Sequence, residues 1–101
     1  MNAAIAGARA YGVAVRFADL GAWGEDELRA EYDPRGPEIR LNLRVAEALA
    51  PEALGEFVTL AIAHELYHHR EHIGEVAIVA DRAARERAAD GYARDLLRAG
   101  A

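Results

Sequence analysis

The chain has 101 residues, a length that fits one compact domain, and 52% of them are apolar, which is enough to build a hydrophobic core. Its formal net charge of −5 argues against a nucleic-acid partner, because phosphate binding favours a basic surface. The sequence contains no cysteine, which excludes disulfides and thiolate metal ligands.

The N-terminus, MNAAIAGARAYG, lacks the basic and strongly apolar regions of a secretory signal peptide. No apolar run approaches the length needed to span a membrane. We therefore expect a soluble, cytoplasmic protein consisting of a single domain, residues 1–101, with neither nucleic acid nor membrane as a partner.

The first part of the chain predicts one short helix and three strands. Residues 2–10 are rich in alanine and favour a short helix. Apolar and polar side chains then alternate in three stretches, which is typical of half-buried strands. These stretches are residues 13–18, 27–33 and 38–44.

The segment between the second and third strands has the composition of a turn. In DPRGP (33–37), Pro34 presets φ and Gly36 is free to adopt a positive φ. Residues 27–44 are therefore expected to form a hairpin, which together with the first strand makes a small antiparallel sheet. One or two helical turns are expected at 44–50.

Two longer helices are predicted in the second half. Pro51 suits the first position of a helix that should run to about His72 and stop near Gly74. Its core stripe recurs every four residues, at Leu54, Val58, Ile62 and Leu66. The second helix should begin within 76–81 and run to about Arg98, although 75–80 could equally be extended. The pattern predicts an α+β fold.

All four histidines of the chain lie in HELYHHREH (64–72). His64 and His68 are four residues apart, so on a helix they share one face and can chelate a single ion. Glu65 would stand beside a water at that ion, which gives the H-E-x-x-H pattern of two zinc ligands and a general base. The alternative is that the two histidines cap a core face and Glu65 is solvated.

A catalytic zinc needs a third protein ligand while one position stays open. His69 points about 100° away from His68 on the helix, and therefore cannot join the same site. His72 shares the face, but three ligands in one row suit tetrahedral zinc poorly. A ligand from another element is geometrically better.

The second long helix offers Glu86 and Asp90. They share a predicted inward stripe of small and apolar residues, namely Val79, Ala83, Ala93 and Leu97. Acids on such a stripe require partners, so Glu86 is the candidate third ligand and Asp90 the acceptor that orients His64. Ala89 and Gly91 are expected to allow close helix packing. The alternative is a solvated charged surface, given the neighbouring residues Arg85, Arg87 and Arg94.

With HELYH (64–68) followed by E-x-x-A-D (86–90), the chain resembles the gluzincin metallopeptidases, and most of all their minimal members, the minigluzincins. IRLNLRVA and FVTLAIAHELYHH are similar to stretches of ImmA/IrrE-type and M48-type peptidases. The resemblance covers roughly residues 38–97. It implies a zincin-like fold, in which a small antiparallel sheet packs on the active-site helix and the C-terminal helix supplies the third ligand.

The resemblance also implies roles for the matching positions. One Zn²⁺ per chain would be held by His64, His68 and Glu86, with Glu65 as general base and Asp90 supporting a ligand. A peptide or protein substrate would pair with an edge strand near Ile39–Leu43. The implied activity is peptide-bond hydrolysis by a zinc-bound water that Glu65 activates.

Several points stay open at this stage. The candidates for cleft or transition-state contacts are Tyr67, His72, Tyr92 and Arg94, and Trp23 is assigned to the core or the cleft rim. The peptidase would be latent or highly restricted in substrate, or would cut a single repressor partner as the ImmA/IrrE resemblance suggests. The alternative from another class is a zinc-bearing regulatory or binding module without useful turnover.

Overall fold

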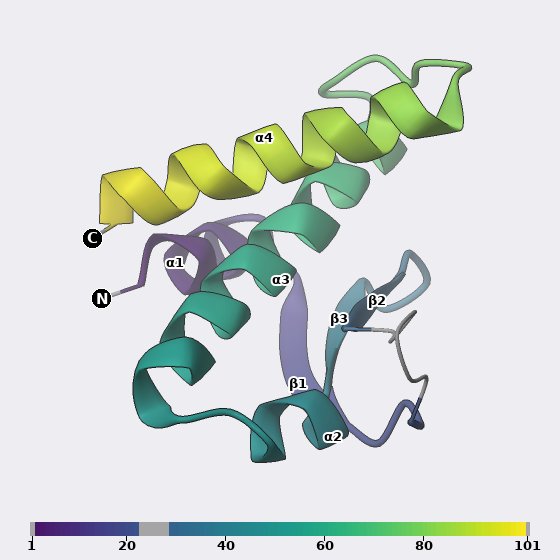
Figure 1. Ribbon diagram of the computed structural model, residues 1–101. Helices are drawn as coiled ribbons and strands as arrows, with labels where there is room; N and C mark the ends of the chain where they lie inside the picture. The colour runs from purple at the N-terminus through teal and green to yellow at the C-terminus, as the bar shows by residue number, and fades with distance from the viewer. Residues whose placement is uncertain (1, 23–28, 101) are drawn as a thin grey trace.

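The computed structural model describes residues 2–22 and 29–100 (Figure 1). The elements in chain order are α1 (Ala3–Ala10), β1 (Ala14–Ala18), β2 (Ala30–Asp33), β3 (Glu38–Asn42), α2 (Leu43–Glu47), α3 (Pro51–His72) and α4 (Arg82–Gly100). This confirms the predicted α+β class. The expectations for Trp23 and for the start of the second strand at residue 27 lie outside the described residues.

The sheet is mixed, with the strand order β1-β3-β2. The predicted hairpin is confirmed, since β2 and β3 are antiparallel with Tyr32 opposite Ile39. The expectation of a wholly antiparallel sheet is wrong, because β1 runs parallel to β3 with Val15 opposite Ile39. Alternation assigns the two faces of a strand but does not determine its partner or direction.

The position of β3 corrects a second expectation. Ile39–Leu43 was predicted to be an edge strand that pairs with substrate, but β3 is hydrogen-bonded on both sides and ends at Asn42. Its backbone groups are therefore already used within the sheet. The outer strands of the sheet, within the part of the chain that the structure describes, are β1 and β2.

The turn between β2 and β3 also differs in detail from the prediction. Gly36 has no positive φ and instead precedes a cis peptide bond to Pro37. A Cβ atom added at Gly36 would lie 2.9 Å from the backbone nitrogen of Glu38. Glycine is therefore required here for close approach of the backbone and not for left-handed φ.

The helix boundaries follow the local sequence closely. Asn42 caps α2, because its side-chain oxygen accepts a hydrogen bond from the backbone N–H of Arg44 at 3.1 Å. Pro51 occupies the first position of α3, which ends at His72 as predicted. Residues 75–80 are neither helix nor strand, so Val79 precedes α4 and is 44% exposed instead of lying on its inner stripe.

The core lies where α3 packs against the sheet, α1 and α4. In Figure 1, α3 runs through the middle of the molecule, with the sheet on one side and α4 along the other. The largest fully buried apolar side chains are Ile39, Leu41, Ile62 and Leu66. The predicted stripe of α3 is thus confirmed in its second half, while Leu54 and Val58 are only partly buried. No helix among the described residues is long and apolar enough to cross a membrane.

Small residues form the inner side of α4. Ala89 and Ala93 are buried, with exposures of 0% and 2%. Gly91 is exposed, and a Cβ atom there would meet nothing within 4 Å. The expectation that Gly91 permits a close helix approach is therefore wrong, because this residue faces away from the packed side. The alanines allow α4 to lie close to α3. This close packing brings the polar side chains of the two helices together.

Candidate metal centre

Two histidine side chains of α3 point to the same place. The Nε2 atoms of His64 and His68 are 3.3 Å apart, as expected for residues one helical turn apart. Two nitrogen ligands of a tetrahedral zinc at the usual bond length are separated by about the same distance, roughly 3.3 Å. Together with Glu65, these histidines offer ligand atoms that all lie within 4.8 Å of one another. The spacing fits a single small cation.

Glu86 reaches this pair from α4. Its Oε2 lies 2.9 Å from His64 Nε2, and its Oε1 lies 3.5 Å from His68 Nε2. The Glu86 side chain is 48% exposed, so it closes the cluster on the solvent side. The structure thus brings together the three residues that the sequence predicts as ligands.

Each histidine is held by a carboxylate at its other ring nitrogen. His64 Nδ1 lies 2.8 Å from Asp90 Oδ1, and His68 Nδ1 lies 2.7 Å from Glu71 Oε1. Because a carboxylate only accepts, we infer that each Nδ1 carries the proton and donates it, which leaves the lone pair on Nε2. A metal ion binds the imidazole through such a lone pair.

Sequence reasoning identified Asp90 but missed Glu71. Glu71 is 5% exposed and is also paired with Arg85, whose Nη2 lies 3.1 Å from Glu71 Oε1. The hydrogen bond from Arg85, and then that from His68, lowers the pKa of the Glu71 carboxyl. The signal was available in the sequence, since Glu71 is three residues after His68 and side chains at this spacing are neighbours on a helix.

A shared cation would satisfy the polar atoms at the centre. If Nδ1 carries the proton on both histidines, two Nε2 lone pairs and the carboxylate of Glu86 face one another at 2.9–3.5 Å. Acceptors repel at such distances unless a positive charge lies between them. Two imidazoles and one carboxylate are a donor set that zinc accepts. The residues present therefore fit a zinc ion.

Glu65 is the buried acid of the site. It is only 9% exposed, and its Oε2 has no hydrogen-bond partner among the described residues. Burial raises the pKa of Glu65 to about 6. A buried carboxylate oxygen without a partner is unusual, and such a group is expected to bind a water, an ion or a substrate.

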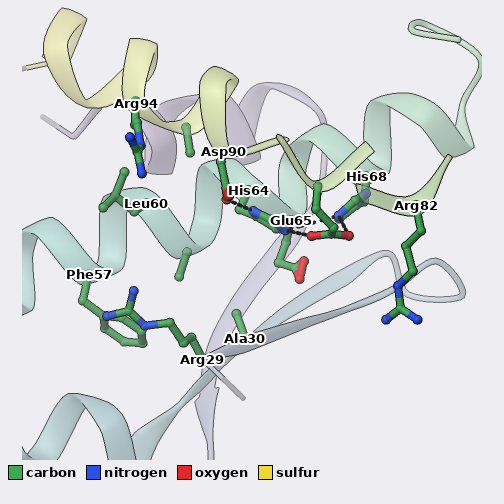
Figure 2. Close-up of a pocket in the computed structure, with 13 residues that line it drawn as sticks. Arg29, Ala30, Phe57, Leu60, His64, Glu65, His68, Arg82, Asp90 and Arg94 are labelled. Carbon is green, nitrogen blue, oxygen red and sulfur yellow. Dashed lines mark hydrogen bonds and ion pairs between the residues drawn. The ribbon is translucent and has the colours of Figure 1, made fainter. Parts of the chain in front are cut away.

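The cluster lies in an open pocket of about 560 Å³, lined by residues of α3 and α4 and by Arg29 and Ala30 at the start of β2 (Figure 2). Apolar side chains of α3, namely Phe57, Leu60 and Ala61, line it beside the polar cluster. The centre is therefore accessible to a ligand of substantial size, and its acid and its histidines face the same space.

The other two histidines of α3 lie outside the metal-binding cluster. His69 is buried on another side of α3, where its Nδ1 is 2.7 Å from the hydroxyl of Tyr32. His72 is exposed and its ring lies 6.4 Å from that of Tyr32. Neither joins the cluster, as the sequence predicts for both. Of the four candidates for cleft or transition-state contacts, Arg94 alone lines the pocket.

Tyr67 and Tyr92 are packing residues in this structure. Their rings are 5.9 Å apart, and Tyr67 also contacts the ring of His68 at 6.2 Å. The guanidinium of Arg70 lies over the ring of Tyr92 at 5.0 Å. Neither tyrosine lines the pocket. Their positions favour a structural role in the contact between α3 and α4.

Comparisons of the chain with protein-family models, with curated proteins and with solved structures give no match.

Proposed function

We propose that this protein is a zinc-dependent metallopeptidase of the gluzincin type. The observation that carries the proposal is the convergence of His64, His68 and Glu86 beside the buried carboxylate of Glu65, whose Oε2 has no partner in the described part of the chain. A structural zinc site is closed by four protein ligands, whereas a catalytic site has three and keeps one position open. Three ligands next to an acid in an accessible pocket favour the catalytic kind.

The protein groups have separate tasks in this proposal. His64, His68 and Glu86 hold the metal, and Asp90 and Glu71 fix the orientation of the two histidines. Bound zinc would polarise the scissile carbonyl and lower the pKa of water to about 7.

Glu65 is the proton carrier. Burial raises its pKa, and a bound zinc ion would act against this shift, so the carboxyl is ionised at neutral pH and can accept the proton of the attacking water. The same carboxyl then donates that proton to the leaving amine.

An extended substrate would lie along β2 and not along β3. Within the sheet that the structure describes, β2 is an outer strand, and Ala30 of β2 lines the pocket with Glu65. A peptide added at a sheet edge gains main-chain hydrogen bonds without disturbing the existing pairs. This placement revises the expected substrate strand and keeps the mode of binding.

The test compares zinc-loaded wild type with Glu65→Gln on a degenerate peptide library, with cleavage read by mass spectrometry. We expect the variant to keep one zinc and the same circular dichroism spectrum, and to cleave about 10²–10⁴-fold more slowly. Glu56→Gln is the matched control, because Glu56 is exposed on the same helix and should change nothing.

Two outcomes would contradict the proposal. Cleavage by Glu65→Gln at the wild-type rate would exclude Glu65 as the proton carrier. Stoichiometric zinc in a wild-type protein that cleaves no peptide of the library would favour a regulatory or binding module instead. Loss of zinc in His68→Ala and Glu86→Ala is expected in either case, so elemental analysis of these variants tests the ligand assignment separately.

A further inference from the structure

Three arginines that line the pocket have no ion-pair partner among the described residues. Arg29 precedes β2, while Arg82 begins α4 and Arg94 lies three turns further along that helix. None of them forms a salt bridge with a residue of the described ranges 2–22 and 29–100. The acids of the pocket instead face the histidines.

Elsewhere in this acidic chain, arginines are generally neutralised. Those that form ion pairs with a carboxylate are Arg16, Arg35, Arg40, Arg44, Arg70, Arg85 and Arg98. Acids outnumber basic residues, 17 to 12, so carboxylates are abundant. Besides the pocket arginines, Arg9 and Arg87 also form no ion pair with a described residue, but neither lines the pocket. Of the guanidinium groups without an ion pair to a described residue, most therefore lie at the pocket.

Two of the pocket arginines frame its apolar end. Figure 2 shows Arg29 and Arg94 on the same side of Glu65 as Phe57 and Leu60, whereas Arg82 lies beyond His68. The Arg29 guanidinium lies over the Phe57 ring, 5.4 Å from its centroid. This cation–π contact favours that position of the guanidinium before any ligand arrives. Arg94 comes from the facing helix α4.

We infer that this end of the pocket is a subsite for a peptide residue that carries a carboxylate. Leu60, which is only partly buried, would contact the apolar part of that residue. Arg29, which lies over the buried ring of Phe57, and Arg94 would bind its carboxylate. The inference deepens the proposed peptidase function, because it names what the pocket selects in a peptide. The carboxylate comes either from a free C-terminus or from an acidic side chain.

Physical reasons favour a carboxylate over a neutral group. A guanidinium presents paired N–H donors whose geometry matches both oxygens of a carboxylate. An unpaired arginine loses no existing ion pair when an anion binds, so the new contact is not offset by a broken one. Hydrogen bonds between charged groups are also about twice as strong as neutral ones. A cationic peptide residue would instead be repelled by both arginines.

The test measures equilibrium binding of three fluorescent N-acetylated tetrapeptides to zinc-loaded Glu65→Gln protein, in which turnover is suppressed. The first ends in leucine with a free carboxylate, the second is its amide, and the third is an amide that ends in aspartate. We expect at least one of the two carboxylate peptides to bind about tenfold or more tightly than the neutral amide. Which of the two it is identifies the source of the carboxylate.

Substitutions then locate the effect. Arg94→Gln should abolish the preference for the carboxylate peptide, and Arg29→Gln should weaken it. Arg87→Gln is the matched control, because Arg87 is exposed on the same helix, outside the pocket, and its loss changes the net charge equally. Equal loss in Arg87→Gln would show a general effect of charge and would overturn the inference. Equal binding of all three peptides, or no binding of any, would overturn it as well.

The binding assay also separates this inference from the proposed function. A carboxylate preference without cleavage by the wild type would refute the peptidase and leave the subsite standing. Cleavage without such a preference would refute the subsite alone.

Discussion

Glu71 and Asp90 each hold one histidine of the candidate centre, and their different burial predicts different effects on zinc affinity. Loss of a carboxylate behind a metal-binding histidine typically weakens metal binding about 10–100-fold. The Asp90 side chain is 59% exposed, so water can replace its oxygen at His64 Nδ1. The Glu71 side chain is 3% exposed, and its oxygen is far less easily replaced at His68 Nδ1.

We therefore expect Asp90→Ala to weaken zinc binding by about tenfold and Glu71→Ala by about 100-fold, which correspond to about 1.4 and 2.8 kcal/mol. Competition with a chromophoric chelator at pH 7.5 measures both affinities. Glu71→Gln is the control, because its amide oxygen still accepts from His68 Nδ1 and should recover part of the loss. Unfolding in EDTA checks that the variants fold.

The ordering is the critical result. A loss in Asp90→Ala that equals or exceeds the loss in Glu71→Ala would show that burial does not set the strength of these contacts. Wild-type affinity in both variants would mean that neither carboxylate supports a metal ligand, and that the ion-pair network of α3 and α4 has a purely structural role.

Three further predictions follow from the same structure. His72→Ala should retain wild-type zinc content by elemental analysis, because His72 is exposed outside the cluster, whereas metal loss equal to that of His64→Ala would make it a ligand. Gly91→Ala should raise the free energy of unfolding by about 0.5–1 kcal/mol in urea titrations, since the added methyl meets nothing within 4 Å; destabilisation would indicate a close contact there. The pKa of Asp33 is held at about 2, first by the side-chain hydrogen bond from Arg35, so its stabilisation is present above pH 3.8 and is lost as the pH falls through 2. The stabilities of wild type and Asp33→Asn should therefore differ at pH 6 and converge towards pH 2, and a constant difference would contradict this assignment.

The parts of the fold that depend on local sequence could be predicted. Pro51 and Gly74 bound α3 because helix starts and stops are set by neighbouring residues, and the turn at 33–37 places β2 beside β3 for the same reason. The partner of β1 could not be predicted. Alternation in 13–18 is equally compatible with pairing to either strand, and the choice depends on the path of the whole chain.

Some residues of the candidate site could likewise be predicted from local sequence, and others could not. His64 and His68 follow from helical spacing alone, and Glu86 follows from the need for a ligand on a second element. Glu71 was missed because a glutamate among charged residues near a helix end resembles a solvated one. The apolar end of the pocket was missed because Arg29 and Phe57 are far apart in the sequence, and only the packing of β2 on α3 brings them into contact.

The pairing of β1 with β3, rather than with the nearer β2, sets an order of events during synthesis. The backbone groups of β1 have no strand partner until residues 38–42 have left the ribosome, and pairings between distant residues form slowly. α1 likewise has no packing partner until α3 has been synthesised, since it packs on α3. A nascent chain interrupted before Glu38 would carry Val15 and Phe17 on an unpaired strand, which is a template for aggregation. We therefore expect a fragment that ends before Glu38 to aggregate more readily than the folded chain, in which one edge of β1 is paired with β3.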